Sequence, residues 1–237
     1  MSGGERTRFR QLALHLTLAD HCSFGNYCEG PNRAAVHAVR AQAAGGGART
    51  CYLCGPAGVG RTHLLQSSCR EVDDRGGRPV YLPLRELAAT GPGVLHGLED
   101  LDQVCVDDVQ LIAGDPEWER ALFTLCNDLR ERGGQLLAAA DGPPAGIGLR
   151  LPDLSSRLAW GPVFRLQPLD DEELLCALQL RARYRGLVLS DDAGRYLLRR
   201  QPRDPDTLFR LLDGLDRAAL AAKRRLTIPF LREMLGN

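Results

Sequence analysis

The segment Gly55-Pro-Ala-Gly-Val-Gly-Arg-Thr62 constrains the fold of this chain more than any other stretch. It matches the phosphate-binding P-loop pattern, Gly-x-x-x-x-Gly-Lys-Ser/Thr, except that arginine replaces the lysine. An apolar run at 50–53 precedes it and a predicted helix over 61–74 follows, so backbone N–H groups and the positive helix end would face an anion. The alternative is an ordinary tight turn between a strand and a helix. The predicted nucleotide contacts are Gly55, Pro56, Ala57, Gly58, Val59, Gly60, Arg61, Thr62 and His63.

Two acids, Asp107 and Asp108, end an apolar run at 104–106. In P-loop proteins an acid in this position holds Mg²⁺, and a neighbouring residue orients the attacking water. We therefore predict that Asp107 and Thr62 hold the metal and that Asp108 orients the water. A pair of solvated carboxylates is the alternative, and the occurrence of both motifs in this order disfavours it.

Arg61 replaces the lysine that usually contacts the β- and γ-phosphates. A guanidinium group is planar and longer than an ammonium group, so it can bind phosphate without stabilising the transferred charge in the same way. We predict a site that holds nucleotide more than it turns it over. The alternative is a general preference for arginine, because all but one of the 30 basic residues are arginine.

The remaining apolar runs alternate with helical patterns, which is typical of a parallel sheet with helices on both faces. Beyond residue 167 the patterns predict helices alone. Asn32, Asp115 and Asp170 are predicted to cap helices. The predicted fold class is α/β, with a small C-terminal all-helical lid. Strands are expected at 50–53, 79–83, 104–106, 135–140 and 163–166, and domains at 1–19 (extended tail), 20–167 (nucleotide-binding core) and 168–237 (lid).

The composition excludes some classes of partner. Positive and negative charges balance at 30 each, which argues against strong direct DNA binding, since that affinity comes from many Lys or Arg contacts with phosphates. No run approaches the roughly 18 apolar residues of a membrane helix, and the start of the chain lacks a secretory pattern. We expect a cytoplasmic protein with no membrane partner.

Eight cysteines are scattered along the chain. In this context we expect free thiols that act as small apolar groups. Cys51 and Cys54 form a Cys-x-x-Cys pattern, but strand residues three apart point to opposite faces of a sheet, and no second pair completes a zinc site. A metal or redox role is the disfavoured alternative.

Several motifs fall in the order seen in the AAA+ region of the replication initiator DnaA. Beside the P-loop they are Phe24-Gly-Asn-Tyr27, Val106-Asp-Asp-Val109, Asp153-Leu-Ser-Ser-Arg157 and Leu226-Thr-Ile-Pro-Phe230. The chain resembles this family over about 20–237 and ends where the initiator continues into its helix-turn-helix DNA-binding domain. Among DnaA relatives it is most similar to the short regulatory inactivators of the initiator. The resemblance implies an AAA+ P-loop core, a bound adenine nucleotide with ADP favoured over ATP, and Mg²⁺.

The resemblance also gives roles to residues outside the P-loop. Arg157 matches an arginine finger that acts in trans on ATP bound by the initiator DnaA, and such fingers accelerate hydrolysis by about 10³–10⁵. Asp141 matches a sensor residue after the fourth strand. The lid position of a nucleotide-sensing arginine holds Asp206, with Arg203 three residues earlier. The sequence leaves open whether Arg203 replaces that arginine.

The segment Gln11-Leu-Ala-Leu-His-Leu16 spaces its leucines by two, which predicts an extended conformation. Leu12, Leu14 and Leu16 could enter an apolar groove while Gln11 fixes the register through hydrogen bonds. The resemblance implies that this segment docks on the sliding clamp of DNA polymerase III. The alternative is the first strand of a sheet.

The leading hypothesis is a regulator that presents Arg157 to ATP on the initiator and promotes its hydrolysis. A self-sufficient AAA+ ATPase, such as a helicase loader, is the competing hypothesis, favoured by the intact Asp107 and Asp108. A P-loop kinase of small molecules fits poorly, because the predicted lid follows the core instead of interrupting it. Homo-oligomerisation through the face that carries Arg157 is left open.

Overall fold

The structure is a computed structural model that describes residues 22–222 and 225–236, apart from the side chains of Asp206, Ala221 and Ala222. The predicted clamp-binding residues Gln11, Leu12, Leu14 and Leu16 lie outside the described residues. None of the described helices is long and apolar enough to cross a membrane.

Five parallel strands form one sheet, which confirms the predicted α/β class. The strands are β1 (Thr50–Cys54), β2 (Pro79–Pro83), β3 (Gln103–Asp107), β4 (Gln135–Ala140) and β5 (Val163–Arg165). Their spatial order is β2-β3-β4-β1-β5. Because all strands run in the same direction, the loop after β1 and the acids at the end of β3 lie at the same edge of the sheet. Ligands bind at this carboxyl edge in open α/β folds.

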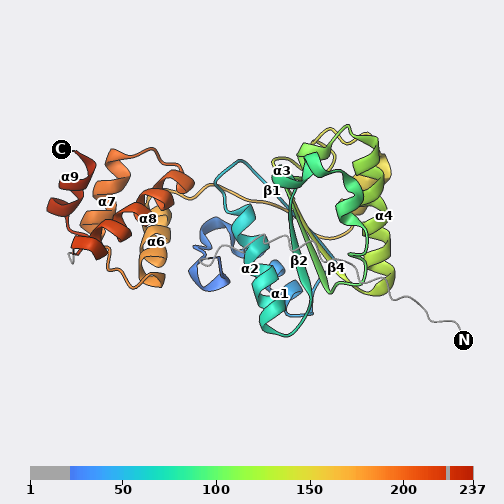
Figure 1. Ribbon diagram of the computed structural model, residues 1–237, viewed down its shortest axis with the longest axis horizontal. Helices are drawn as coiled ribbons and strands as arrows, with labels where there is room; N and C mark the ends of the chain where they lie inside the picture. The colour runs from blue at the N-terminus through green and yellow to red at the C-terminus, as the bar shows by residue number, and fades with distance from the viewer. Residues whose placement is uncertain (1–21, 223–224, 237) are drawn as a thin grey trace, which may run out of the picture.

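Helices cover both faces of the sheet (Figure 1). Helices α1 (Arg33–Ala43) and α2 (Arg61–Asp74) pack on one face with Cys51, whereas α4 (Pro116–Arg132) and α5 (Pro152–Leu158) pack on the other with Cys54. The two thiols therefore point to opposite faces, as predicted. The sequence pattern does not predict α5, because its seven residues are too few to show a helical period. The short elements are η1 (Phe24–Asn26), η2 (Gly30–Asn32), α3 (Leu84–Leu87), η3 (Ala88–Thr90), η4 (Pro92–Leu95) and η5 (Val109–Ile112).

The chain beyond β5 forms a cluster of helices beside the sheet (Figure 1). They are α6 (Asp171–Tyr184), α7 (Asp191–Arg200), α8 (Pro205–Ala222) and α9 (Ile228–Leu235). The predicted capping box at the start of α6 is present, since Asp170 and Glu173 each accept the other's backbone N–H. This helical region has an apolar core of its own, built around Leu178, Leu212 and Phe230.

Asn32 connects the start of α1 to the segment that leads into the helical region. Its Nδ2 donates to the Gln167 carbonyl at 3.0 Å, and its Oδ1 accepts the Gln167 N–H at 2.8 Å. Asn32 occupies the N-cap position of α1, but its side chain makes no bond to the helix backbone, so the predicted capping bond is wrong. The amide is buried, and a reciprocal pair of bonds to one backbone unit satisfies both of its ends.

Glu119 is a buried carboxylate on α4. Its oxygens accept backbone N–H bonds from Gly114 at 2.6 Å, from Arg150 at 2.9 and 3.1 Å, and from Leu151 at 2.7 Å. These bonds compensate for the water that the charge loses on burial. They also fix the segment that leads into α5, the helix that carries Arg157.

We predict that Glu119→Gln lowers the free energy of unfolding by about 1–3 kcal/mol, because the new amide N–H₂ would leave backbone donors unpaired. The measurement is the midpoint of urea denaturation. Glu131→Gln, exposed on the same helix, is the control and should change the free energy by less than about 0.5 kcal/mol. Equal midpoints for the two variants would contradict this role of Glu119.

Candidate nucleotide-binding site

The P-loop is held against Tyr27. The Tyr27 hydroxyl donates to the Val59 carbonyl at 3.2 Å, and its ring lies edge-on to His63, with 5.3 Å between the ring centroids. Gly60 has a φ of +92°, and a Cβ at Gly60 would lie 2.6 Å from Cε2 of Tyr27. The left-handed backbone and the close approach both require glycine here.

Thr62 and Asp107 join the two predicted motifs. Thr62 Oγ1 donates to Asp107 Oδ2 at 2.6 Å, and the Tyr81 hydroxyl donates to the same oxygen at 3.0 Å. Burial raises the pKa of the Asp107 carboxyl above its ordinary value, against the hydrogen bond from Thr62, which lowers it. A cation beside Asp107 would stabilise its ionised form.

Donor groups contact both carboxylate oxygens of Asp108. Arg85 Nε donates to Oδ2 at 3.1 Å, Gln110 Nε2 donates to Oδ1 at 3.0 Å, and Arg61 Nη2 lies 3.7 Å from Oδ1. Asp108 also has a φ of +57°, and among the described residues no other non-glycine residue has a positive φ. Backbone strain of this kind is concentrated at functional sites.

Arg61 carries a guanidinium donor that none of the described residues satisfies. The side chain is 11% exposed, and Nη1 is buried with no hydrogen-bond partner among the described residues. A buried donor without an acceptor costs about 1–3 kcal/mol. A phosphate oxygen is an acceptor that guanidinium groups bind well. The residues of the loop therefore fit a phosphate group.

A cavity of about 590 Å³ lies between the P-loop and the helical region. Helix α8 begins against the loop, since a Cβ at Gly58 would lie 3.2 Å from Pro205 Cδ. The volume suits a small-molecule ligand. The sheet region lines the cavity with Tyr27, residues 57–63, Arg85 and Asp108, and the helical region lines it with Arg181, Pro205, Phe209, Arg210 and Asp213, among others.

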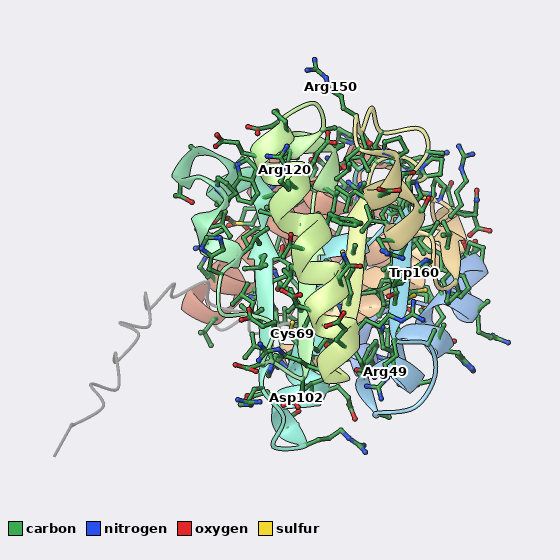
Figure 2. All side chains as sticks on the ribbon, turned by 90° about the vertical axis from the view of Figure 1, so that its right-hand side faces the viewer. Arg49, Cys69, Asp102, Arg120, Arg150 and Trp160 are labelled. Carbon is green, nitrogen blue, oxygen red and sulfur yellow. The ribbon has the colours of Figure 1, made fainter. Side chains whose placement is uncertain are left out.

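A second cavity, of about 790 Å³, lies beside the amino ends of the strands, where Figure 2 shows Arg49 and Asp102. Its arginines already interact with carboxylate or carbonyl groups of the protein. Arg78 lies 3.6 Å from Asp102, Arg132 lies 3.9 Å from Glu99, and Arg49 donates to the Gly133 carbonyl. Helices α2 and α4 also end here, so the negative ends of their dipoles face the cavity. We therefore assign the candidate nucleotide site to the cavity at the P-loop.

The helical region contributes arginines other than the expected one. Arg203 is exposed, lies 3.0 Å from Asp171 and does not line the cavity. The side chain of Asp206 is not described. Arg210 lines the cavity instead and forms no ion pair with a described carboxylate. It follows Asp206 by one helical turn, and this spacing is the signal by which the sequence could have indicated it.

The other predicted site residues do not join this cavity. Pro56 is exposed, and neither Gly55 nor Pro56 lines it. Asp141 is exposed at the end of β4, and its N–H donates to Gln110 Oε1 at 3.3 Å. Arg157 lies on α5 and is also absent from the lining. The structure therefore brings Asp107 and Asp108 to the P-loop, and leaves Asp141 and Arg157 outside the cavity.

The metal-binding capacity of the site is limited. Within the described ranges no group of three or more His, Cys, Asp or Glu side chains could hold a metal ion. Thr62 and Asp107 supply two oxygen ligands, which fits Mg²⁺ bound together with phosphate and water.

The expectation of buried cysteines needs a correction, since Cys28 is half-buried and Cys176 is exposed, whereas the other six are buried.

Comparison with known proteins agrees with this geometry. Residues 94–165 match the family model of the bacterial DnaA ATPase domain, and residues 170–235 match the model of the Hda lid domain. Domain III of DnaA from Thermotoga maritima is similar at 23% identity and a TM-score of 0.76, over 92% of this chain and 96% of that one. AMPPCP-bound DnaA from Aquifex aeolicus is 22% identical, with a TM-score of 0.67 over 86% of this chain and 66% of that one. The RuvB Holliday junction branch migration motor of Thermotoga maritima is 17% identical, with a TM-score of 0.62 over 86% of this chain and 66% of that one.

The parallel sheet, the P-loop after β1, the acids at the end of β3 and the C-terminal helices together define an AAA+ P-loop fold. Within this class the chain is similar to the DnaA proteins over residues 94–165, and its helical region matches the lid domain of Hda. The resemblance seen in the sequence motifs is thereby confirmed.

We predict that Gly60→Ala destabilises the protein more than Gly76→Ala does. Both glycines have left-handed backbones, with φ of +92° and +79°, but a Cβ at Gly76 has no atom within 4 Å. Gly76→Ala should therefore cost only the backbone term of about 1–2 kcal/mol, and Gly60→Ala should add the clash with Tyr27. Urea denaturation measures both free energies. A smaller loss for Gly60→Ala would contradict the described contact.

Proposed function

We propose that this chain regulates chromosome replication by acting on the initiator DnaA. It binds nucleotide, docks on the sliding clamp and stimulates hydrolysis of the ATP bound to the initiator, which inactivates the initiator. The observation that carries the proposal is the combination of a DnaA-type ATPase region with an Hda-type lid in one chain. The protein acts in the cytoplasm, where initiator and clamp are found, and needs no strong DNA contact of its own.

The proposed ligand of the cavity is an adenine nucleotide, with ADP favoured over ATP. The similar Aquifex aeolicus DnaA is an AMPPCP complex, which supports this choice. Gly58, Gly60 and Arg61 would hold the phosphates through backbone N–H groups and the unpaired Nη1. Thr62 and Asp107 would hold Mg²⁺, which, when bound, neutralises negative charge on phosphate oxygens.

The surroundings of Asp108 support the proposal that the chain itself hydrolyses nucleotide slowly. A residue that orients water accepts a hydrogen bond from it, and each carboxylate oxygen has about two acceptor sites for such bonds. Arg85 and Gln110 each donate to one oxygen of Asp108, and Arg61 lies close to Oδ1, so these groups compete with a water molecule for Asp108. The site is therefore suited to holding nucleotide, and the decisive hydrolysis is assigned to the site of the partner.

Arg157 is the residue proposed to act on the partner. It lies on α5, outside the chain's own cavity, so a role in trans does not compete with the resident nucleotide. An arginine finger stabilises the charge that develops on the transferred phosphoryl group. The same face could also contact the nucleotide of a second copy of the chain.

The alternative function is a self-sufficient AAA+ ATPase, such as a helicase loader. It is favoured by the presence of Asp107 and Asp108, and by the hydrogen bond that places Thr62 beside Asp107. The two functions differ in what the purified chain does alone. Appreciable ATP hydrolysis that neither initiator nor clamp changes would favour the ATPase.

We predict that Arg157→Ala lowers the stimulated hydrolysis of initiator-bound ATP by about 10³-fold or more, because the charge in the transition state loses its partner. The measurement is phosphate release from ATP-loaded DnaA in the presence of clamp loaded on DNA. Binding of the variant to the clamp should stay as in the wild type. Unchanged stimulation would refute the finger assignment.

We predict that Gln11→Ala combined with Leu12→Ala removes capture of the chain by immobilised sliding clamp. Losing one buried leucine weakens binding by about 1.5–3 kcal/mol, and the register-fixing hydrogen bonds are lost as well. Arg157→Ala is the matched control and should be captured normally. Retained capture of the double variant would leave the segment as an ordinary strand.

A further inference from the structure

The guanidinium group of Arg157 is held by an aromatic ring instead of a carboxylate. Its Cζ lies 3.7 Å from the centroid of the Trp160 indole and 5.5 Å from the ring of Phe123. Arg157 forms no ion pair with a described carboxylate, and its Nε is buried with no hydrogen-bond partner among the described residues. Cation–π attraction over the face of tryptophan is therefore the main described contact of this charge.

A second arginine also contacts the indole of Trp160. Arg130 of α4 also lies over the indole, with its Cζ 4.0 Å from the ring centroid, and it too lacks an ion pair with a described carboxylate. The indole itself is 40% exposed, and Figure 2 shows it on the face that carries α4. Two unneutralised guanidinium groups on one exposed ring make a surface that suits a strongly anionic partner group, such as a triphosphate.

The backbone around Trp160 is fixed by contacts with a helix end and with the sheet. The backbone N–H of Trp160 donates to the Arg157 carbonyl at 3.2 Å, which closes the end of α5. The next residue, Gly161, passes so close to β1 that a Cβ there would lie 1.7 Å from the Thr50 carbonyl oxygen. The Pro162 carbonyl accepts the Tyr52 N–H at 3.0 Å. The backbone on both sides of the indole is thus tied to a helix end and to the sheet.

From this geometry we propose that Trp160 is a positioning residue for Arg157, which orients the guanidinium group before the partner arrives. The inference rests on the proposed action of Arg157 on partner-bound ATP. A stacked guanidinium uses its face and leaves its in-plane N–H donors free for phosphate oxygens, whereas a carboxylate would occupy those donors. Because the side chain is already ordered, binding of the partner costs less side-chain conformational entropy than it would for a free arginine.

The test compares Trp160→Ala and Trp160→Phe with the wild type in the hydrolysis of DnaA-bound ATP. Maximal rate and half-saturating concentration of the chain are measured separately. Trp160→Ala should lower the maximal rate on the order of 10- to 100-fold, the loss expected for a misplaced catalytic group, and leave the half-saturating concentration within about twofold. Trp160→Phe should retain most of the rate. Val163→Ala, which removes another apolar side chain that is 40% exposed, is the control and should match the wild type.

Two results would overturn the positioning role. One is a maximal rate of Trp160→Ala equal to that of the wild type. The other is a change confined to the half-saturating concentration, which would make Trp160 a docking contact. Thermal unfolding followed by circular dichroism identifies any variant that loses rate because it does not fold, and the resonance measurement on the wild type then carries the test.

A spectroscopic measurement on the free chain separates this inference from the proposed function. Ring currents of the indole should shift the Arg157 side-chain proton resonances upfield in the wild type, and Trp160→Ala should remove that shift. Random-coil shifts in the wild type would overturn the stacking. A wild type that shows the upfield shift but does not stimulate hydrolysis would overturn the proposed function, and the role in trans would fall with it.

Discussion

The hydrogen bond from Thr62 to Asp107 is the contact on which the candidate site depends. It joins the first turn of α2 to the carboxyl end of β3, with β4 lying between β1 and β3 in the sheet. The bond can form because the strands are parallel and their ends meet at one edge. Burial of this contact raises the pKa of Asp107, so the site favours a ligand that brings positive charge to the carboxylate.

The guanidinium groups of this chain differ in their contact partners, and these partners indicate different functions. Arg181 makes a bidentate pair with Asp213 and has a structural role in the helical region. Arg61 lies in the P-loop with a buried donor that no described residue pairs, which suits a phosphate. Arg157 lies on an indole with its in-plane donors largely unused. Arginine identity says little about function in a chain so rich in arginine, whereas the partner of each guanidinium group says much more.

The local features of the fold could be predicted from the sequence. The strand before the P-loop, the helix 61–74 and the capping residues Asp115 and Asp170 all lie where expected. Each of these depends on interactions within a few residues, such as a proline in the first helical turn or a carboxylate that accepts nearby N–H groups. The P-loop and the acids after β3 could be placed for the same reason, because each motif is short and complete in itself.

By itself, then, the sequence determined the α/β class, the order of the strands and the position of the candidate phosphate-binding loop. The tertiary structure decided which side chains surround that loop and which stay away from it. Asn32 bonds Gln167 instead of capping α1, Arg210 lines the cavity in place of Arg203, and Arg157 stacks on Trp160. The first of these contacts joins residues 135 positions apart, and it depends on how the start of α1 packs against the segment after β5. Spacing along the chain reports the period of one element, but it carries no information on which residues of another element will face it.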